Sequence, residues 1–215
     1  MVKAVFFDLD GTLLDTLPDI HACVCEMLRA FSYPEITQMQ TQSYVGDGAR
    51  KLIERALPKN ATNIDECHDF FRERYTKSGN SLTKLFEGET EALKALKARG
   101  LKLAIITNKP HTATYSCVEK FFPEGMFDFI GGDSGMFACK PDPSLTRYAA
   151  LTLRVPLKEC VFFGDGEADV LTAKNAGMRC LSVLWGYRTK QQLEKVGARE
   201  FVSSFSELVK VLENA

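Results

Sequence analysis

Four short apolar runs constrain the fold of this chain more than any other feature. They occupy residues 5–7, 103–106, 160–163 and 180–184. Each run is apolar over nearly its whole length, which is typical of parallel strands that are covered on both faces. Helical patterns separate the later runs, so the sequence predicts an open, doubly wound parallel α/β sheet of the Rossmann-like kind. We expect a further short strand over residues 127–130.

The segment from about residue 16 to residue 84 breaks this alternation, because it shows helical periodicity and no convincing strand. Three apolar stripes at helical spacing lie within it. They comprise Ile20, Val24, Met27, Leu28 and Phe31, then Ala49, Leu52, Ile53, Ala56 and Leu57, then Ile64, Cys67, Phe71 and Tyr75. We therefore expect residues 1–15 and 85–215 to form the α/β core and residues 16–84 to form an inserted helical cap. The two crossings, near residues 15–16 and 85–86, would act as hinges.

Charge and composition narrow the range of partners. The 215 residues carry 27 basic and 28 acidic side chains, which gives a formal net charge of −1. No basic field is present to hold a nucleic acid, and no polybasic stretch indicates an anionic membrane. We therefore expect a small-molecule ligand, no nucleic acid or membrane partner, and a monomer or homodimer. An anionic ligand would have to be held by a few local charges or by a metal ion.

The cysteines and the first residues indicate the compartment. Seven cysteines are scattered along the chain and form no C-x-x-C pair, so we expect them to be small buried residues in a reducing environment. The first apolar run ends at Asp8 and is far too short for a signal peptide. The sequence therefore predicts a cytoplasmic protein.

Polar residues follow three of the predicted strands. In an α/β sheet, ligands bind beyond the carboxyl ends of the strands, so these residues are expected to meet at one edge. They are Asp8 and Asp10 after the first strand, Thr107 and Asn108 after the second, and Asp165 and Asp169 after the third. One such placement could arise by chance, but three at the same edge favour a functional site.

The spacing of Asp8 and Asp10 points to a metal ion. In an extended chain, residues two apart project to the same side, so the two carboxylates would repel each other unless a cation lay between them or one were protonated. Asp165 would bring a third carboxylate. Oxygen ligation with few protein groups suits Mg²⁺, which usually binds beside a substrate phosphate. The alternative is a turn with a helix cap, which a bare D-x-D-G would favour.

Two further features could bind an anion. Thr107 and Asn108 offer a hydroxyl and backbone amides at a strand end, although an ordinary helix cap would explain this pair alone. Lys140 lies in Lys140-Pro141-Asp142-Pro143, where the prolines fix a rigid entry to the next helix. A single lysine is usually solvated, but here it could supply the local cation that the near-neutral chain otherwise lacks.

Together these residues resemble the four motifs of the haloacid dehalogenase superfamily. Residues 6–15 resemble the first motif, Thr107-Asn108 the second, Lys140-Pro141 the third, and residues 164–169 the fourth. Their order and separations fit, and they bracket nearly the whole chain. The helical insertion resembles the cap of the phosphoglycolate phosphatase and β-phosphoglucomutase branch.

The resemblance implies roles for the acidic residues. Asp8 would be the nucleophile that forms an aspartyl-phosphate, and Asp10 would protonate the leaving oxygen and then activate water. Asp8, the backbone carbonyl of Asp10, and Asp165 would hold Mg²⁺. Asp169 would support the site from behind, as a partner of Lys140.

The same resemblance implies roles for the remaining motif residues. Gly11, Thr107 and the Asn108 amide would bind substrate, and Lys140 would neutralise charge and position Asp8. Gly166 departs from the pattern, because a Ser or Thr commonly follows the first Asp of the fourth motif. The presence of Asp10 favours phosphate chemistry over carbon–halogen cleavage, since dehalogenases of this type lack the second Asp.

The expected cap contains a loop that bears on substrate choice. Residues 44–52 resemble the cap loop of phosphoglycolate phosphatases, in which Gly46 and Gly48 would allow close backbone approach and Arg50 could meet a carboxylate. A plain turn with a solvated Arg50 is an equal alternative. Trp185 and Tyr187, after the fourth run, could line the mouth of the site.

The sequence thus favours a Mg²⁺-dependent phosphomonoester hydrolase, with 2-phosphoglycolate as the leading substrate. A β-phosphoglucomutase-like phosphotransferase and a nucleotide or pyrophosphate phosphatase remain open. From a different class, a phospho-Asp binding or signalling module without turnover is also possible, although it would need neither Asp10 nor a cap.

Overall fold

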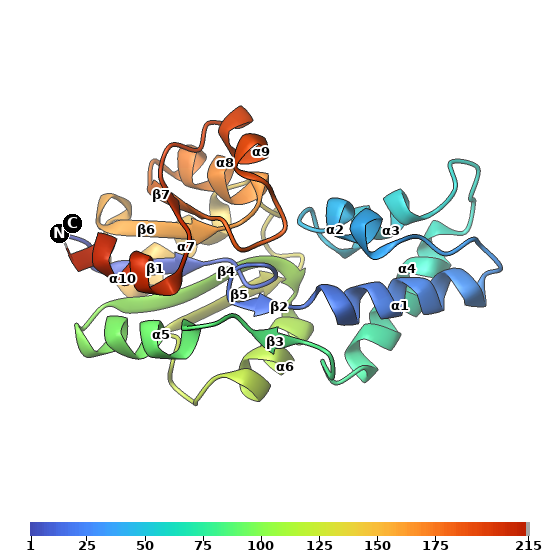
Figure 1. Ribbon diagram of the computed structural model, residues 1–215, viewed down its shortest axis with the longest axis horizontal. Coiled ribbons are helices and arrows are strands. Elements are labelled where there is room, and N and C mark those ends of the chain that lie inside the picture. Colours follow the sequence, from blue (N-terminus) through green and yellow to red (C-terminus); the bar gives the residue numbers. More distant parts are fainter. Residues whose placement is uncertain (214–215) are drawn as a thin grey trace.

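The computed structural model describes residues 1–213, and its centre is a six-stranded parallel sheet (Figure 1). The order across the sheet is β5-β4-β1-β6-β7-β8. The strands are β1 (Ala4–Phe7), β4 (Lys102–Pro110), β5 (Phe129–Asp133), β6 (Cys160–Gly164), β7 (Arg179–Val183) and β8 (Phe201–Val202). The predicted doubly wound α/β sheet is confirmed, and each of the four apolar runs overlaps a strand.

Helices cover both faces of this sheet, which explains why its strands are apolar throughout. Alternate residues of β1 serve different cores, with Val5 and Phe7 in one buried cluster and Ala4 and Phe6 in another. The first cluster includes residues of α5 (Glu89–Ala98), α6 (His111–Phe121) and α10 (Phe205–Glu213). The second includes residues of α7 (Ser144–Leu153) and α8 (Glu167–Ala176). The short helices η1 (Leu157–Glu159) and α9 (Lys190–Lys195) complete this part of the chain.

Four helices form a separate body at one end of the molecule (Figure 1). They are α1 (Leu17–Ala30), α2 (Gln38–Tyr44), α3 (Ala49–Ala56) and α4 (Ile64–Lys77). Most of the predicted apolar stripes are buried in one cluster that these helices share, while Phe31, Ala49 and Ile64 are partly buried at its margin. A helical body with its own hydrophobic core is therefore inserted between β1 and α5.

A two-stranded antiparallel ribbon joins the two bodies. It consists of β2 (Leu14–Asp15) and β3 (Lys84–Leu85), in which Leu14 pairs with Leu85 and Asp15 with Lys84. The chain therefore leaves the core and returns to it along adjacent strands (Figure 1). Lys84, which the helical pattern assigned to the cap, belongs to this ribbon.

Five of the seven cysteines are buried as expected, whereas Cys180 is only partly buried and Cys139 is exposed. Cys139 is exposed, because it lies in the irregular segment before Lys140 rather than in a helix or strand core. All seven thiols are free. Within residues 1–213, no helix has the length and apolar character needed to cross a membrane.

Candidate active site

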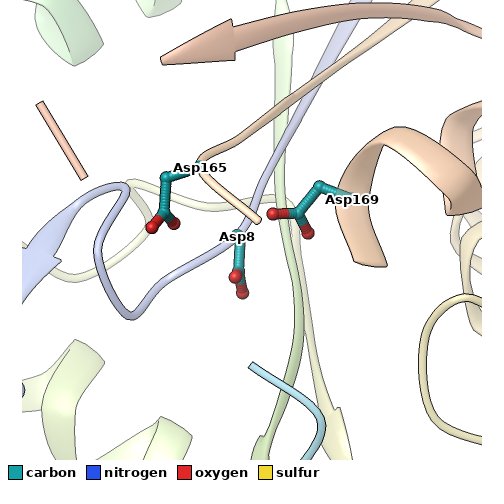
Figure 2. Close-up of side chains that lie close together, drawn as sticks. All are labelled: Asp8, Asp165 and Asp169. Carbon is teal, nitrogen blue, oxygen red and sulfur yellow. The ribbon is translucent and has the colours of Figure 1, made fainter. Parts of the chain in front are cut away.

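Three carboxylates converge at the carboxyl edge of the sheet. Asp8 follows β1, Asp165 follows β6, and Asp169 lies on the first turn of α8. All three residues are buried, and one oxygen from each lies within 4.8 Å of the others. Figure 2 shows Asp8 between the other two side chains. The central strands β1 and β6 are hydrogen-bonded neighbours, so the sheet itself fixes the approach of Asp8 to Asp165.

Lys140 supplies the cation that lies within this cluster. Its Nζ is 2.9 Å from Oδ1 of Asp8 and 2.6 Å from Oδ1 of Asp169, and its side chain is only 3% exposed. Burial by itself would lower the pKa of Lys140, but the charges of Asp169 and Asp8 outweigh burial and raise the pKa above its usual value. One ammonium group thus faces three carboxylates. If all three are ionised, two negative charges remain unbalanced.

Asp165 shows the effect of this imbalance. Burial, followed by the charges of Asp169 and Asp8, raises the pKa of Asp165 to about 7. Hydrogen bonds from the backbone amide of Tyr187 (2.7 Å) and the hydroxyl of Thr12 (2.9 Å) act in the opposite direction. A divalent cation would relieve the repulsion, and buried carboxylate oxygens are the donors that Mg²⁺ prefers. The residues present therefore fit a magnesium ion.

Both oxygens of the Asp169 carboxylate accept hydrogen bonds. One of its oxygens accepts the Lys140 ammonium, and the other accepts the backbone N–H of Gly166 at 2.9 Å. Asp165 makes no ion pair within residues 1–213, and the polar partners of Asp8 there all contact its Oδ1, so these two carboxylates are better placed than Asp169 for direct metal contact. Because the capping bond comes from the Gly166 backbone, the Gly in place of Ser or Thr does not disturb it.

The carboxylate of Asp10 lies outside the cluster of Asp8, Asp165 and Asp169, so the third carboxylate there comes from Asp169 rather than Asp10. Strand β1 ends at Phe7, and Oδ1 of the following Asp8 accepts a hydrogen bond from the Leu9 amide. Oδ1 of Asp10 instead accepts the hydroxyl of Thr16 and the ammonium of Lys109, each at 2.8 Å. Asp8 and Asp10 nevertheless line the same cavity.

Gly11 fits closely against Asp165 and does not line the cavity. Its φ is +82°, and a Cβ at this position would lie 2.5 Å from Oδ2 of Asp165. Only glycine fits the turn that brings the first motif beneath this carboxylate. The structure therefore gives Gly11 a packing role and does not bring it to the expected substrate position.

Thr107 and Asn108 lie near the end of β4 and line the cavity. The Asn108 amide group donates to the backbone oxygens of Gly46 (3.0 Å) and Lys140 (3.1 Å), and its oxygen accepts the Lys140 amide at 2.7 Å. One side chain thus holds the Lys140 backbone beside the loop of the helical body. The Thr107 hydroxyl accepts the backbone amide of Lys109 at 3.3 Å.

A cavity of about 300 Å³ lies between the core and the helical body. Gly46 and Gly48, between α2 and α3, form part of its wall, as does Tyr187 from the core. Trp185 does not line it, because its indole N–H donates to the Thr12 carbonyl and its ring packs between Phe86 and Phe205.

Arg50 is not brought into the cavity. Its guanidinium pairs with Glu54 and Asp65 on the surface of the helical body. Arg55 lines the cavity instead, about 1.4 helical turns further along α3 and therefore on a different side of the helix. The solvated alternative for Arg50 is the one that the structure supports.

Three basic residues of the cavity were missed by the sequence reasoning, namely Arg55, Lys109 and Arg188. Lys109 is buried beside Asp10, and Arg188 joins the core to the helical body. The Arg188 guanidinium pairs with Glu167 at 2.8 Å and donates to the carbonyls of Gln42 (2.8 Å) and Val45 (2.6 Å). Position in the sequence could have indicated Lys109 and Arg188, since they directly follow Asn108 and Tyr187, which had been assigned to the site.

The fold and the site are those of a hydrolytic enzyme with an α/β core, in which buried carboxylates and a lysine lie at the sheet edge that faces the inserted helical body. The chain belongs to the haloacid dehalogenase-like hydrolase family, whose profile matches residues 5–183. Within that family it is a phosphatase of the phosphoglycolate phosphatase-like kind.

Individual relatives match over nearly the whole chain. A phosphoglycolate phosphatase of Vibrio vulnificus strain YJ016 is 32% identical over 98% of this chain and 96% of its own length. The crystal structure of a predicted phosphoglycolate phosphatase from Haemophilus somnus 129Pt superposes with a TM-score of 0.90 at 25% identity, covering 98% of both chains. CbbY from Rhodobacter sphaeroides, solved in complex with phosphate, has a TM-score of 0.79 at 26% identity, covering 97% of this chain and 96% of its own.

Proposed function

We propose that this enzyme hydrolyses the phosphate monoester of a small metabolite in the presence of Mg²⁺, through an aspartyl-phosphate on Asp8, and that 2-phosphoglycolate is its substrate. The observation that carries the proposal is the arrangement of Asp8 and Asp10. Both side chains line one cavity, and each has its own buried lysine at 2.9 and 2.8 Å. Two carboxylates in different environments are suited to different chemical roles.

The first step transfers the phosphoryl group to the enzyme. A carboxylate oxygen of Asp8 attacks phosphorus as the bond to the ester oxygen breaks, and the protonated carboxyl of Asp10 gives its proton to the leaving oxygen. In the second step, Asp10 takes a proton from water, whose oxygen attacks phosphorus as the bond to Asp8 breaks. Inorganic phosphate leaves, and both side chains return to their starting state.

The remaining site residues would stabilise charge in these steps. Asp8, Asp165 and the backbone carbonyl of Asp10 would hold Mg²⁺, which when bound supplies positive charge beside the phosphoryl oxygens. The Thr107 hydroxyl and the Asn108 amide would bind phosphoryl oxygens, and Lys140 would balance Asp8. These contributions are positioning and electrostatic stabilisation, on which phosphoryl transfer mainly depends.

We further propose that residues 16–84 act as a cap that closes over the site and selects the leaving group. The cavity of about 300 Å³ suits a small metabolite. Gly46 and Gly48 place backbone rather than side chains against it. The relatives named as phosphoglycolate phosphatases favour 2-phosphoglycolate over a sugar phosphate or nucleotide. A phosphate acceptor without turnover is less well supported, because the acid–base side chain of Asp10 lies in the same cavity as Asp8.

Phosphate release from a panel of substrates tests this function. The panel contains 2-phosphoglycolate, hexose phosphates, nucleotides and pyrophosphate, each assayed with Mg²⁺ and again with excess chelator. We expect metal-dependent release that is fastest with 2-phosphoglycolate and is abolished in a folded Asp8→Asn variant. A preference for hexose phosphates would refute the substrate, and full activity of Asp8→Asn would refute the nucleophile.

A further inference from the structure

The buried ammonium of Lys109 connects the core to the helical body at the site. Its Nζ lies 2.8 Å from Oδ1 of Asp10 and 2.5 Å from the hydroxyl of Tyr75, over whose ring it sits at 4.5 Å from the centroid. Lys109 comes from β4 of the core, whereas Tyr75 comes from α4 of the helical body. One lysine thus contacts both the proposed acid–base residue and the proposed cap.

From this geometry we infer that Lys109 is a positioning residue, which orients Asp10 for proton transfer when the helical body covers the cavity. The inference rests on the proposed function, since it gives Lys109 a task only if Asp10 moves protons. Lys109 itself exchanges no proton with substrate.

The hydrogen bonds to Asp10 all fall on one of its two oxygens. Thr16 and Lys109 both donate to Oδ1, and within residues 1–213 no other hydrogen bond reaches this carboxylate. Two donors on one oxygen fix the rotation of the carboxyl group. Oδ2 is thereby kept available to a leaving oxygen or to water.

The position of Lys109 is itself fixed by burial. Its side chain is 2% exposed, and Asp10 is its sole ion-pair partner among residues 1–213. A buried ammonium that lost this carboxylate would keep an uncompensated charge, so the pair resists separation. The cation–π contact with Tyr75 adds a second restraint.

Tyr75 makes this arrangement depend on the helical body. Its ring stacks on Phe71 at 5.6 Å between centroids, and both belong to the buried cluster of that body. If the body swung away on the β2–β3 ribbon, Tyr75 would move with it and Lys109 would lose its hydroxyl partner and its aromatic face. Asp10 would then be held correctly only in the closed form, in which water is excluded from the cavity.

Two single variants and their combinations with Asp10→Asn test the inference. Lys109→Met keeps the length of the side chain and removes its charge, and Tyr75→Phe removes only a hydroxyl. Lys120→Met is a matched control, because Lys120 also joins the core to the helical body, through the carbonyls of Gly79 and Asn80, but does not line the cavity. Thermal unfolding verifies that each variant is folded.

We expect Lys109→Met to lower kcat on 2-phosphoglycolate by about 10- to 100-fold and to change KM far less. This loss of kcat is smaller than the ~10²–10⁴-fold loss expected when the acid–base group itself is removed. Tyr75→Phe should also lower kcat, but by a smaller factor than Lys109→Met. With p-nitrophenyl phosphate, whose leaving group needs no proton, Lys109→Met should give a burst of nitrophenol followed by slow turnover. In the Asp10→Asn background Lys109→Met should have little further effect, because it acts through Asp10.

A loss from Lys109→Met that is equally large in the Asp10→Asn background would overturn the inference, as would a comparable loss from Lys120→Met. If Lys109→Met does not fold, Tyr75→Phe with and without Asp10→Asn provides the same comparison. An unimpaired Asp10→Asn would overturn the proposed role of Asp10 and this inference with it. An impaired Asp10→Asn beside fully active Lys109→Met and Tyr75→Phe would overturn the inference alone.

Discussion

The ammonium nitrogen of Lys140 lies 2.9 Å from Oδ1 of Asp8, and both side chains are almost fully buried. The same nitrogen contacts Asp169 at 2.6 Å, so Lys140 holds together two elements at the edge of the sheet. Removing one member of a buried ion pair leaves the other charge without compensation, which is more costly than losing the pair as a whole.

Lys140→Met is expected to destabilise the fold and to slow catalysis. The free energy of unfolding should fall by about 3–5 kcal/mol, and kcat should fall by roughly 10²–10³-fold as the charge beside Asp8 is lost. Chemical denaturation and steady-state kinetics measure the two effects. Lys102→Met provides the control, since its ion pair with Asp128 is half-exposed and contributes at most ~1 kcal/mol. Equal losses from both variants would contradict the importance of the buried pair.

Magnesium should stabilise the protein through Asp165. A ligand present at 100 times its Kd raises the free energy of unfolding by about 2.7 kcal/mol, so the melting temperature should rise with added Mg²⁺ and fall on chelation. Asp165→Asn should abolish this rise. Calorimetry without substrate gives the result independently of turnover, and an unchanged Mg²⁺ response in Asp165→Asn would exclude Asp165 as a ligand.

Arg50→Ala should change kcat/KM by less than about twofold, because a substitution on the surface, away from the cavity, has small effects. Arg188→Ala should instead raise KM by about tenfold, since Arg188 donates charge-assisted hydrogen bonds to the carbonyls of Gln42 and Val45. Steady-state kinetics on 2-phosphoglycolate compare the two variants. A change in kcat/KM from Arg50→Ala well above twofold would indicate that Arg50 contacts the substrate after all.

Glu89 should make stability depend on pH. Burial raises the pKa of Glu89 to about 7, although a hydrogen bond from the Thr90 hydroxyl acts in the opposite direction. Oε1 of Glu89 has no hydrogen-bond partner among the described residues. The folded protein therefore binds this proton more tightly than the unfolded chain does. The free energy of unfolding should fall by roughly 3 kcal/mol between pH 4.5 and 7 on this account and change little above pH 7. Glu89→Gln should be more stable than the parent at pH 8 and similar at pH 4.5, as measured by urea denaturation; equal stability at both pH values would contradict the prediction.

The sheet could be predicted because its strands are buried on both faces. Residues 5–7 and 160–163 could be recognised as strands from local sequence, since they are uniformly apolar and too short for a buried helix. The β2–β3 ribbon could not be found in this way. Two-residue strands carry no periodicity, and they exist because the two crossings of the chain meet in space. The edge strand β8, also of two residues, escaped prediction for the same reason.

The acidic residues of the site were accessible from the sequence because strand ends in a parallel sheet share an edge. Their orientations were not, because the path of the chain after Asp8 depends on the turn at Gly11 and on its contact with Asp165. Lys109 escaped notice for a different reason. A lysine is solvated by default, and only the tertiary position of Asp10 and Tyr75 makes burial of this one favourable.

The β2–β3 ribbon also determines how far the inserted segment can vary without disturbing the catalytic core. Asp15 and Lys84 are direct partners in an antiparallel ladder, so the two ends of the 16–84 insertion are fixed side by side. An insertion anchored in this way can be shortened, lengthened or exchanged for an unrelated one while the register of the six-stranded sheet, and with it the spacing of Asp8 and Asp165, is preserved. If the insertion selects substrate as proposed, the same catalytic core could therefore be combined with different insertions.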